Sequence, residues 1–288
     1  MLINLKRNVI LFSLTGITLL SACSKSSDTA APEVTPPTTP GSTDLSLKLG
    51  TDATFGSILT DAAGKTLYFF AIDANGTSGC TGGCELAWPV YYAGNETAPT
   101  GITGTDISTI TRADGKKQTT YKGWPLYYYA ADTKGQISGD GSGGTWFVAK
   151  PDYSIMLSSN QLIGLDGKNY LADTKEGIGS SIYLTDAAGR TLYAFSPDKF
   201  NLNTYTKADL SNNGTWPIYE SSVLNVPSVL KKDVMAEITS VGKKQLTYKG
   251  HPLYYFGPDA KRGETKGVSV PSPGVWPVMT LTTATLAP

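Results

Sequence analysis

The sequence predicts an all-β fold made of two tandem homologous domains, each built from two meander units. The stretch ILTDAAGKTLYFFAID at 58–73 returns as YLTDAAGRTLYAFSPD at 183–198, and QTTYKGWPLYYYAAD at 118–132 returns as QLTYKGHPLYYFGPD at 245–259. A nearly constant offset between long matching stretches indicates a duplicated unit. Within each stretch, turn residues separate runs rich in Tyr, Thr, Leu and Ile, which is typical of short antiparallel strands.

The second repeated stretch carries a clear strand–turn–strand signal. The runs TTY and PLYY flank Lys122-Gly123, and the runs LTY and PLYY flank Lys249-Gly250. A glycine at this place suits a two-residue hairpin turn, so we expect a hairpin in each copy.

The two halves of each copy also resemble each other, because each has a turn, a Tyr-rich strand and a Trp-led strand. The chain therefore contains four repeats of about 50–60 residues. We predict a first β-domain over 46–152, a connecting segment over 153–169 that joins the domains or opens the second one, and a second β-domain over 170–288. A single four-bladed, propeller-like ring is the alternative. Two domains are favoured, because each copy holds a full pair of units.

The start of the chain predicts an export signal over 1–22. A basic beginning and an apolar run over 9–20 precede the sequence LSAC. A run of about 12 residues is too short to cross a bilayer, which takes about 20. The sequence LSAC resembles the bacterial lipobox, and this implies a lipoprotein with an acyl chain such as palmitate on Cys23; an ordinary signal peptide is the alternative. Ser24 follows in place of Asp, which by the same resemblance favours the outer membrane of a bacterial cell envelope.

Residues 23–45 are rich in Ser, Thr and Pro, and we expect them to form a flexible, lipid-anchored linker. They have too few large apolar side chains to offset the entropy of ordering. Cleavage after residue 22 leaves 22 Lys and Arg against 24 Asp and Glu. This small negative charge, without any basic run, excludes nucleic acid as an expected partner. The expected partners are the membrane, through the lipid, and an envelope protein or a glycan.

Each repeat contains the pattern Tyr-x-aromatic-x-x-Asp. Its four copies are Tyr68-Phe70-Asp73, Tyr127-Tyr129-Asp132, Tyr193-Phe195-Asp198 and Tyr254-Phe256-Asp259. This chain resembles the bacterial secreted-repeat lipoproteins, a family that is described by the same pattern and whose function is unassigned. The resemblance covers about residues 50–280 and implies an architecture and a location, without a reaction.

The motif also has a direct physical interpretation. Residues two apart in a strand share a face, so each tyrosine and the aromatic residue after it are expected to stack on one side of the sheet. The aspartate lies just beyond the strand, where it can cap a turn by accepting backbone N–H bonds. Two functional alternatives stay open. One is calcium bound by loop carboxylates, although calcium needs six to eight oxygen ligands and no EF-hand pattern is present. The other is a glycan stacked on exposed rings.

The sequence CTGGC holds Cys80 and Cys84, and a disulfide that staples this loop is the favoured interpretation. Cysteines of an exported protein meet an oxidising compartment, and the intervening glycines allow a tight loop. The matching stretch at 205–217 has no cysteine, so the pair is dispensable for the fold. The alternative is a copper or thiol-redox site at the two cysteines. It predicts accessible thiols near a Met or His, and a closed disulfide packed under Trp88 would count against it.

The sequence shows no catalytic constellation. The lone histidine, His251, precedes a proline in a turn with no nucleophile beside it, and Asp61 and Asp186 lie in turns of the sequence LTDAAG. We therefore expect no catalytic residue and no cofactor apart from the lipid. The favoured function is a non-enzymatic envelope lipoprotein that binds or scaffolds a ligand. It predicts a groove or patch between the domains and no cluster of titratable groups with shifted pKa. A hydrolase acting on cell wall or glycan would need paired carboxylates in one cleft.

Overall fold

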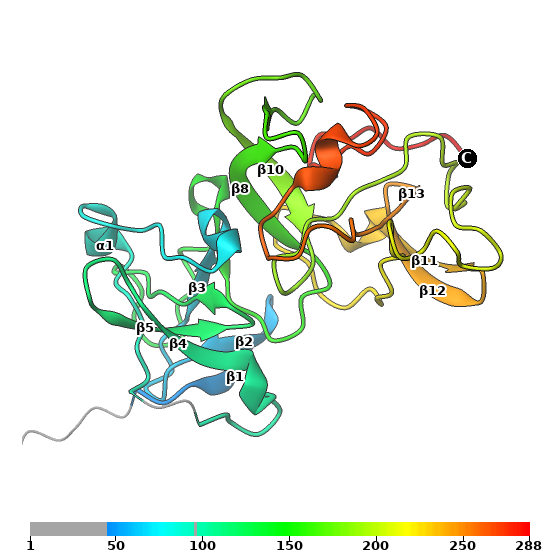
Figure 1. The fold of residues 1–288 in the computed structure, drawn as a ribbon. Coiled ribbons are helices and arrows are strands. Elements are labelled where there is room, and N and C mark those ends of the chain that lie inside the picture. Colours follow the sequence, from blue (N-terminus) through cyan, green and yellow to red (C-terminus); the bar gives the residue numbers. More distant parts are fainter. Residues whose placement is uncertain (1–44, 95–96) are drawn as a thin grey trace, which may run out of the picture. The chain divides into compact units, whose positions relative to one another are not determined.

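The computed structural model describes residues 45–94 and 97–288, and short strands dominate this part of the chain (Figure 1). The strands of the first copy are β1 (Lys48–Asp52), β2 (Gly56–Thr60), β3 (Tyr68–Phe70), β4 (Ile107–Thr111), β5 (Lys117–Tyr121), β6 (Trp124–Pro125) and β7 (Trp146–Val148). Those of the second copy are β8 (Met156–Ile163), β9 (Asn169–Tyr170), β10 (Ser180–Thr185), β11 (Met235–Ser240), β12 (Lys243–Tyr248) and β13 (His251–Pro252). The expected all-β fold is confirmed.

In the part of the chain that the structure describes, helical structure is limited to single turns. The one α-helical turn in the described residues is α1 (Cys84–Ala87). The 3-10 turns are η1 (Ala71–Asn75), η2 (Gly104–Asp106), η3 (Ser142–Gly144), η4 (Lys232–Val234) and η5 (Lys266–Ser269). Among residues 45–94 and 97–288, no helix has the length and apolar character that a membrane span needs.

The sheets of the two copies follow the duplicated sequence. In the first copy, β1 pairs with β2, β3 pairs with β7, and β4, β5 and β6 form a three-stranded antiparallel sheet. In the second copy, β11, β12 and β13 repeat this three-stranded sheet, and β8 pairs with β10 as β1 does with β2. The counterpart of the β3–β7 pair is reduced there to an isolated bridge of Tyr193 with Val278. The repeat thus keeps its pairing pattern even where regular strands are lost.

The expected two-residue turns are present in both copies. Lys122 and Gly123 have φ angles of 48° and 77°, and Lys249 and Gly250 have φ angles of 51° and 82°. Positive φ at both central residues is the geometry of a type I′ turn, which matches the twist of the flanking strands. These turns carry Trp124 and His251 at equivalent places.

The expected connecting segment, 153–169, contributes to the sheet of the second copy. Strand β8 begins inside it and pairs antiparallel with β10, with Met156 opposite Thr185. The hairpin of β8 and β9 then follows within the sequence LIGLDGKNYL. Residues Thr43–Pro288 form one compact unit. The described strands lie in five separate small sheets without a closed barrel, so the propeller-like ring is not confirmed.

The buried side chains explain why the two copies pack as one unit. Ala71 and Phe147 of the first copy share a hydrophobic cluster with Leu184, Leu192 and Leu246 of the second. Each copy also has an aromatic cluster of its own, around Trp88 and Trp146 in the first and around Trp216 and Trp276 in the second. Burial of such apolar surface is the dominant favourable contribution to folding.

Candidate functional site

The four motif tyrosines and four motif aspartates pair across the half-units of each copy. Each tyrosine hydroxyl donates to the aspartate of the other half-unit, never to the aspartate of its own motif. The pairs are Tyr68 with Asp132, Tyr127 with Asp73 (2.6 Å), Tyr193 with Asp259 (2.6 Å) and Tyr254 with Asp198 (2.6 Å). All eight residues are buried. The motif therefore cross-links two repeats and does not act within one.

The second carboxylate oxygen of each motif aspartate caps the loop that follows it. The backbone N–H donors are Gly79 to Asp73 (2.7 Å), Ser138 to Asp132 (3.1 Å), Thr204 to Asp198 (2.7 Å) and Lys266 to Asp259 (2.9 Å). Both oxygens of every motif carboxylate thus accept a hydrogen bond from the protein, which is how a buried carboxylate is stabilised. In the described part of the chain, no group of three or more His, Cys, Asp or Glu side chains could hold a metal ion.

The motif aromatic residues end a stack of four rings in each copy. Trp88 and Trp146 stack with centroids 3.8 Å apart, Phe70 covers Trp146 at 3.9 Å, and Tyr129 covers Trp88 at 4.5 Å. The second copy repeats this order with Phe195, Trp276, Trp216 and Phe256. Each motif aromatic thus packs on the tryptophan of the other half-unit. The four tryptophans of the two stacks recur at the same offset as the motif. This recurrence is the sequence signal that could have shown that they belong to the repeated motif.

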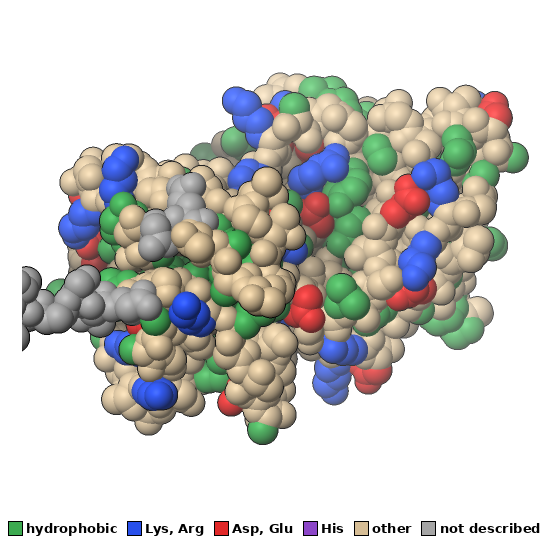
Figure 2. Space-filling model, turned by 90° about the horizontal axis from the view of Figure 1, so that it is seen from below, with side chains coloured by type: hydrophobic (Ala, Val, Ile, Leu, Met, Phe, Trp, Pro, Cys, Tyr) green, Lys and Arg blue, Asp and Glu red, His purple; other side chains and the backbone are tan. Residues whose placement is uncertain are grey.

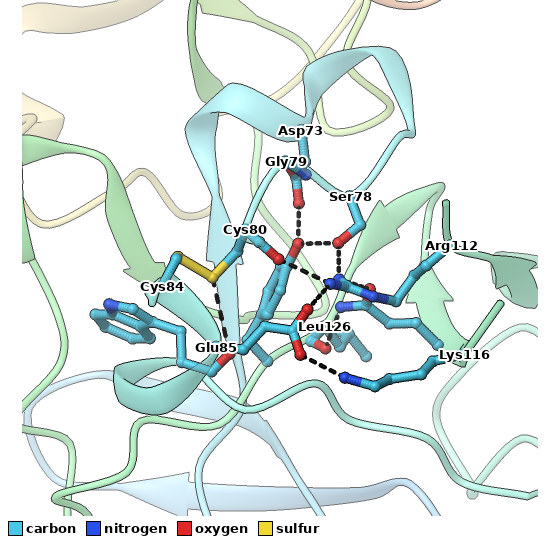
Figure 3. Close-up of a disulfide and its surroundings, with 12 residues drawn as sticks. Asp73, Ser78, Gly79, Cys80, Cys84, Glu85, Arg112, Lys116 and Leu126 are labelled. Atoms are coloured by element: carbon cyan, nitrogen blue, oxygen red, sulfur yellow. Dashed lines mark hydrogen bonds and ion pairs between the residues drawn. A yellow bond between two sulfur atoms is a disulfide. The ribbon is translucent and has the colours of Figure 1, made fainter. Parts of the chain in front are cut away.

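Cys80 and Cys84 form a disulfide, with their Cα atoms 5.3 Å apart (Figure 3). Cys80 is fully buried and lies in the aromatic cluster with Trp88. Its counterpart in the second copy is Tyr205, which packs against Trp276 at 4.7 Å. The disulfide thus fills core space that an aromatic ring fills in the other copy. This packing under Trp88 counts against the copper or thiol-redox interpretation.

Arg112, which the sequence reasoning missed, ties the disulfide loop to the sheet of β4 and β5. The side chain is buried, and Nη2 donates to the carbonyl oxygen of Cys80 at 2.8 Å. Nη1 donates to Oε1 of Gln118 at 3.0 Å, and further contacts reach Ser78 and Glu85 (Figure 3). Arginine is suited to this role because its planar donors satisfy several acceptors at once. It is peculiar to the first copy, as the cysteines are.

Burial raises the pKa of three motif aspartates, Asp73, Asp198 and Asp259. It raises the pKa of Asp73 to about 7, against the opposing hydrogen bonds from Tyr127 and Gly79. It also raises the pKa of Asp259 to about 7, against the hydrogen bonds from Tyr193 and Lys266. The expectation that no titratable cluster would have shifted pKa is therefore wrong. These carboxyls are enclosed by the core, so the shift reflects desolvation.

A polar cleft of about 460 Å³ lies between residues of the two copies. Its lining on one side comprises Asp106 and Lys122 of the first copy and Tyr153, which directly follows that copy. The lining from the second copy comprises Asp186, Glu220 and Tyr255. Asp186 already has a partner within the protein, because its Oδ2 accepts a hydrogen bond of 2.7 Å from the hydroxyl of Tyr255. Asp61 pairs with Tyr128 in the same way, at 3.0 Å. Both LTDAAG aspartates are therefore turn residues with a structural partner.

One face of the described part of the molecule shows no strong charge asymmetry. On the face in Figure 2, basic and acidic side chains are scattered among polar and hydrophobic ones, without a large area of one sign. His251 is the first residue of β13, and its Nε2 lies 3.0 Å from the carbonyl oxygen of Ala284, which accepts the hydrogen bond. Cys23, the expected lipid attachment residue, lies outside the described residues.

Comparison with known proteins agrees with the repeat architecture. Segments 51–91, 108–150 and 236–280 match a family described as a secreted repeat of unknown function. They contain three of the four motifs, and the segment around Tyr193 and Asp198 shares the same Tyr–Asp pairing. No curated protein and no solved structure matches the chain. Three repeats of this chain thus belong to this secreted-repeat family, whose function is unassigned.

Proposed function

We propose that this protein is a non-enzymatic lipoprotein of the bacterial cell envelope whose ectodomain, residues 46–288, binds a ligand at the cleft between its two copies. The observation that carries this proposal is that the motif tyrosines and aspartates bond to one another inside the core. Every motif carboxylate accepts a tyrosine hydroxyl and a backbone N–H, so these groups build the core. A ligand therefore meets surface groups, and those of the cleft between the copies include carboxylates and a tyrosine.

The chemistry of the cleft favours a glycan. Asp106 and the exposed Glu220 present carboxylate oxygens, and the partly exposed Tyr255 belongs to the same lining. Carboxylates accept hydrogen bonds from sugar hydroxyls, and an aromatic ring offers an apolar contact for the pyranose face. A short oligosaccharide therefore suits this cleft better than an apolar ligand.

Calorimetric titration of residues 43–288 with defined envelope glycans tests the proposal. The probes are muropeptides from peptidoglycan and core oligosaccharides from lipopolysaccharide. We expect one class to bind, and the double variant Asp106→Ala/Glu220→Ala to bind about tenfold more weakly, the loss of about 1.4 kcal/mol. The matched control is Asp173→Ala/Glu176→Ala, which removes two exposed carboxylates elsewhere. Absence of binding by both classes, or cleavage of the glycan detected by mass spectrometry, contradicts the proposal.

Anchoring at Cys23 is a separate part of the proposal, supported by the lipobox-like sequence LSAC. Mass spectrometry of the N-terminal peptide of the membrane-extracted protein is expected to show an acylated Cys23. The variant Cys23→Ala is expected to lose the acyl chain and leave the outer-membrane fraction. An unmodified cysteine would show that an ordinary signal peptide precedes the linker.

A further inference from the structure

The two copies meet through a turn that docks on a hairpin. The indole Nε1 of Trp124, in the β5–β6 hairpin of the first copy, donates to the carbonyl oxygen of Ala187 in the second at 3.0 Å. Arg262 of the second copy donates to the carbonyl oxygens of Lys122 (3.0 Å) and Ala74 (2.5 Å) of the first. Its guanidinium carbon also lies 4.9 Å from the ring centroid of Trp124. This contact therefore combines hydrogen bonds with a cation–π interaction.

Glycines make room for this contact. A Cβ atom on Gly123 would lie 1.7 Å from Nη1 of Arg262, and one on Gly189 would lie 2.8 Å from the carbonyl oxygen of Ala74. Both glycines also have positive φ angles, 77° and 84°. The docking turn and its hairpin are thus shaped for each other.

The C-terminal tail makes the equivalent contacts on the second copy. His251 occupies the place of Trp124, and its Nε2 bonds to the carbonyl oxygen of Ala284 as Trp124 bonds to that of Ala187. The backbone N–H of Leu286 donates to the carbonyl oxygen of Lys249 at 3.0 Å, as Arg262 donates to that of Lys122. The tail therefore occupies part of the hairpin face that a following copy would occupy, and Phe200 lies against Gly250 where Arg262 lies against Gly123 in the first copy.

The tail covers this face loosely. Ala284 and Thr285 are exposed, and a hollow of about 220 Å³ is lined by Thr285, Gly250 and Phe200. A well-packed contact would leave few such voids. The tail is therefore a poor substitute for a docked domain.

The first copy carries an exposed docking turn of its own. Residues 60–64 have the sequence TDAAG, identical to the docking turn at 185–189. Ala62 and Ala63 at its tip are exposed, and a hollow of about 320 Å³ lies beside the turn. Lys134, the counterpart of Arg262, lies along Gly64, where a Cβ atom would be 3.2 Å from the lysine Cε.

We propose that the tail, residues 282–288, is a displaceable cap, and that the face beneath it binds the 60–64 turn of a second copy of this chain. The contact would repeat the internal one between the copies, because the turn is identical and the receiving hairpin has the same backbone carbonyl. Such a contact is heterologous, so assembly proceeds head to tail. The contact between chains is expected to be weaker than the internal one, because Lys134 replaces Arg262 and His251 replaces Trp124.

Sedimentation velocity of residues 43–288, which form one compact unit, and of a variant lacking residues 284–288 tests the proposal. The full unit is expected to be monomeric and the shortened one to associate with rising concentration. In the shortened chain, His251→Trp is expected to tighten association about tenfold, since an indole N–H and a cation–π contact are restored. A peptide of residues 281–288 is expected to reverse it.

Matched variants locate the contact and keep the test decisive. In the shortened chain, Ala62→Glu is expected to abolish association, whereas Ala113→Glu, in the exposed β4–β5 turn, leaves it unchanged. Leu286→Pro in the full-length unit removes the N–H group that bonds to the carbonyl oxygen of Lys249, so it is expected to release the tail and allow association. This variant replaces the deletion if the deletion lowers the yield of folded protein. A folded, monomeric shortened chain and a monomeric Leu286→Pro variant, both up to high micromolar concentration, overturn the proposal. Association of the shortened chain that is unchanged by Ala62→Glu overturns the proposal as well.

Discussion

The hydroxyl of Tyr127 donates a 2.6 Å hydrogen bond to Asp73, 54 positions earlier in the chain. The reverse pair, Tyr68 with Asp132, spans 64 positions. Each motif therefore gives its tyrosine to one pair and its aspartate to the other. A single repeat would leave the tyrosine hydroxyl and one carboxylate oxygen without their partners in this pairing, which is costly in an apolar core. The stable unit of this fold is thus a pair of repeats.

Truncating the tryptophan stack is expected to destabilise the whole unit. Trp146 lies between Phe70 and Trp88, and Trp276 holds the same place in the second copy. We expect Trp146→Ala and Trp276→Ala each to lower the free energy of unfolding by about 3–5 kcal/mol, the range for large core truncations. Because the copies share a hydrophobic cluster, urea unfolding of either variant should remain a single transition. Two separate transitions would show that the copies fold independently.

Stability is expected to depend on pH through the buried carboxyls. The folded-state pKa values of Asp73 and Asp259, about 7, lie above the usual range for Asp, so folding favours their protonated forms. The contribution of these carboxyls to the free energy of unfolding is fully present below about pH 4 and is lost as the pH rises to about 7. Urea unfolding of the wild type and of Asp259→Asn between pH 4 and 8 checks this. The variant should gain stability relative to the wild type with rising pH, by up to about 4 kcal/mol; a constant difference contradicts it.

The disulfide is expected to act as a local staple. Thiol titration of the denatured, unreduced ectodomain should find no free thiol, and metal analysis should find no stoichiometric copper or zinc. The variant Cys80→Ser/Cys84→Ser is expected to remain folded and to lose about 2 kcal/mol, since the closed loop is short. Tyr205 fills the corresponding core position, so the fold tolerates the missing bond. Two free thiols, or one copper bound per chain, would restore the metal or redox interpretation.

Arg262 is expected to stabilise the contact between the copies. Arg262→Met leaves the carbonyl oxygens of Ala74 and Lys122 without this donor, and we expect a loss of about 2–3 kcal/mol in urea unfolding. Lys134→Met is the matched control, because Lys134 is the exposed counterpart in the first copy. Its effect should stay within about 0.5 kcal/mol. Equal effects of the two substitutions would mean that Arg262 adds nothing specific.

The sequence was informative wherever the signal was local or repeated. The all-β class, the turns at Lys122-Gly123 and Lys249-Gly250, and the capping of loops by the motif aspartates follow from residue types and short spacings. The duplication itself explained why the cysteines are dispensable: the second copy lacks them and keeps the fold. Physical rules for turns and strands act over a few residues, so these features could be predicted.

The long-range partners could not be predicted in this way. Nothing in one motif says that Tyr127 bonds to Asp73 and not to Asp132, since both are equally plausible from local geometry. Arg112 gave no signal because it is a single arginine in a hairpin turn, and its role depends on a loop about 30 residues away. The difference between Trp124 and His251 became interpretable only with their neighbours in place: a docked turn covers one, and the tail covers the other.

Two double-mutant cycles decide whether the motif cross-links two repeats. One cycle combines Tyr127→Phe with Asp73→Ala, and the other combines Tyr127→Phe with Asp132→Ala; the free energy of unfolding is measured for each variant. Cross-linking predicts a coupling energy of about 1–2 kcal/mol in the first cycle and additivity within about 0.5 kcal/mol in the second. Coupling of Tyr127 to Asp132 with none to Asp73 would show that each motif acts within its own repeat.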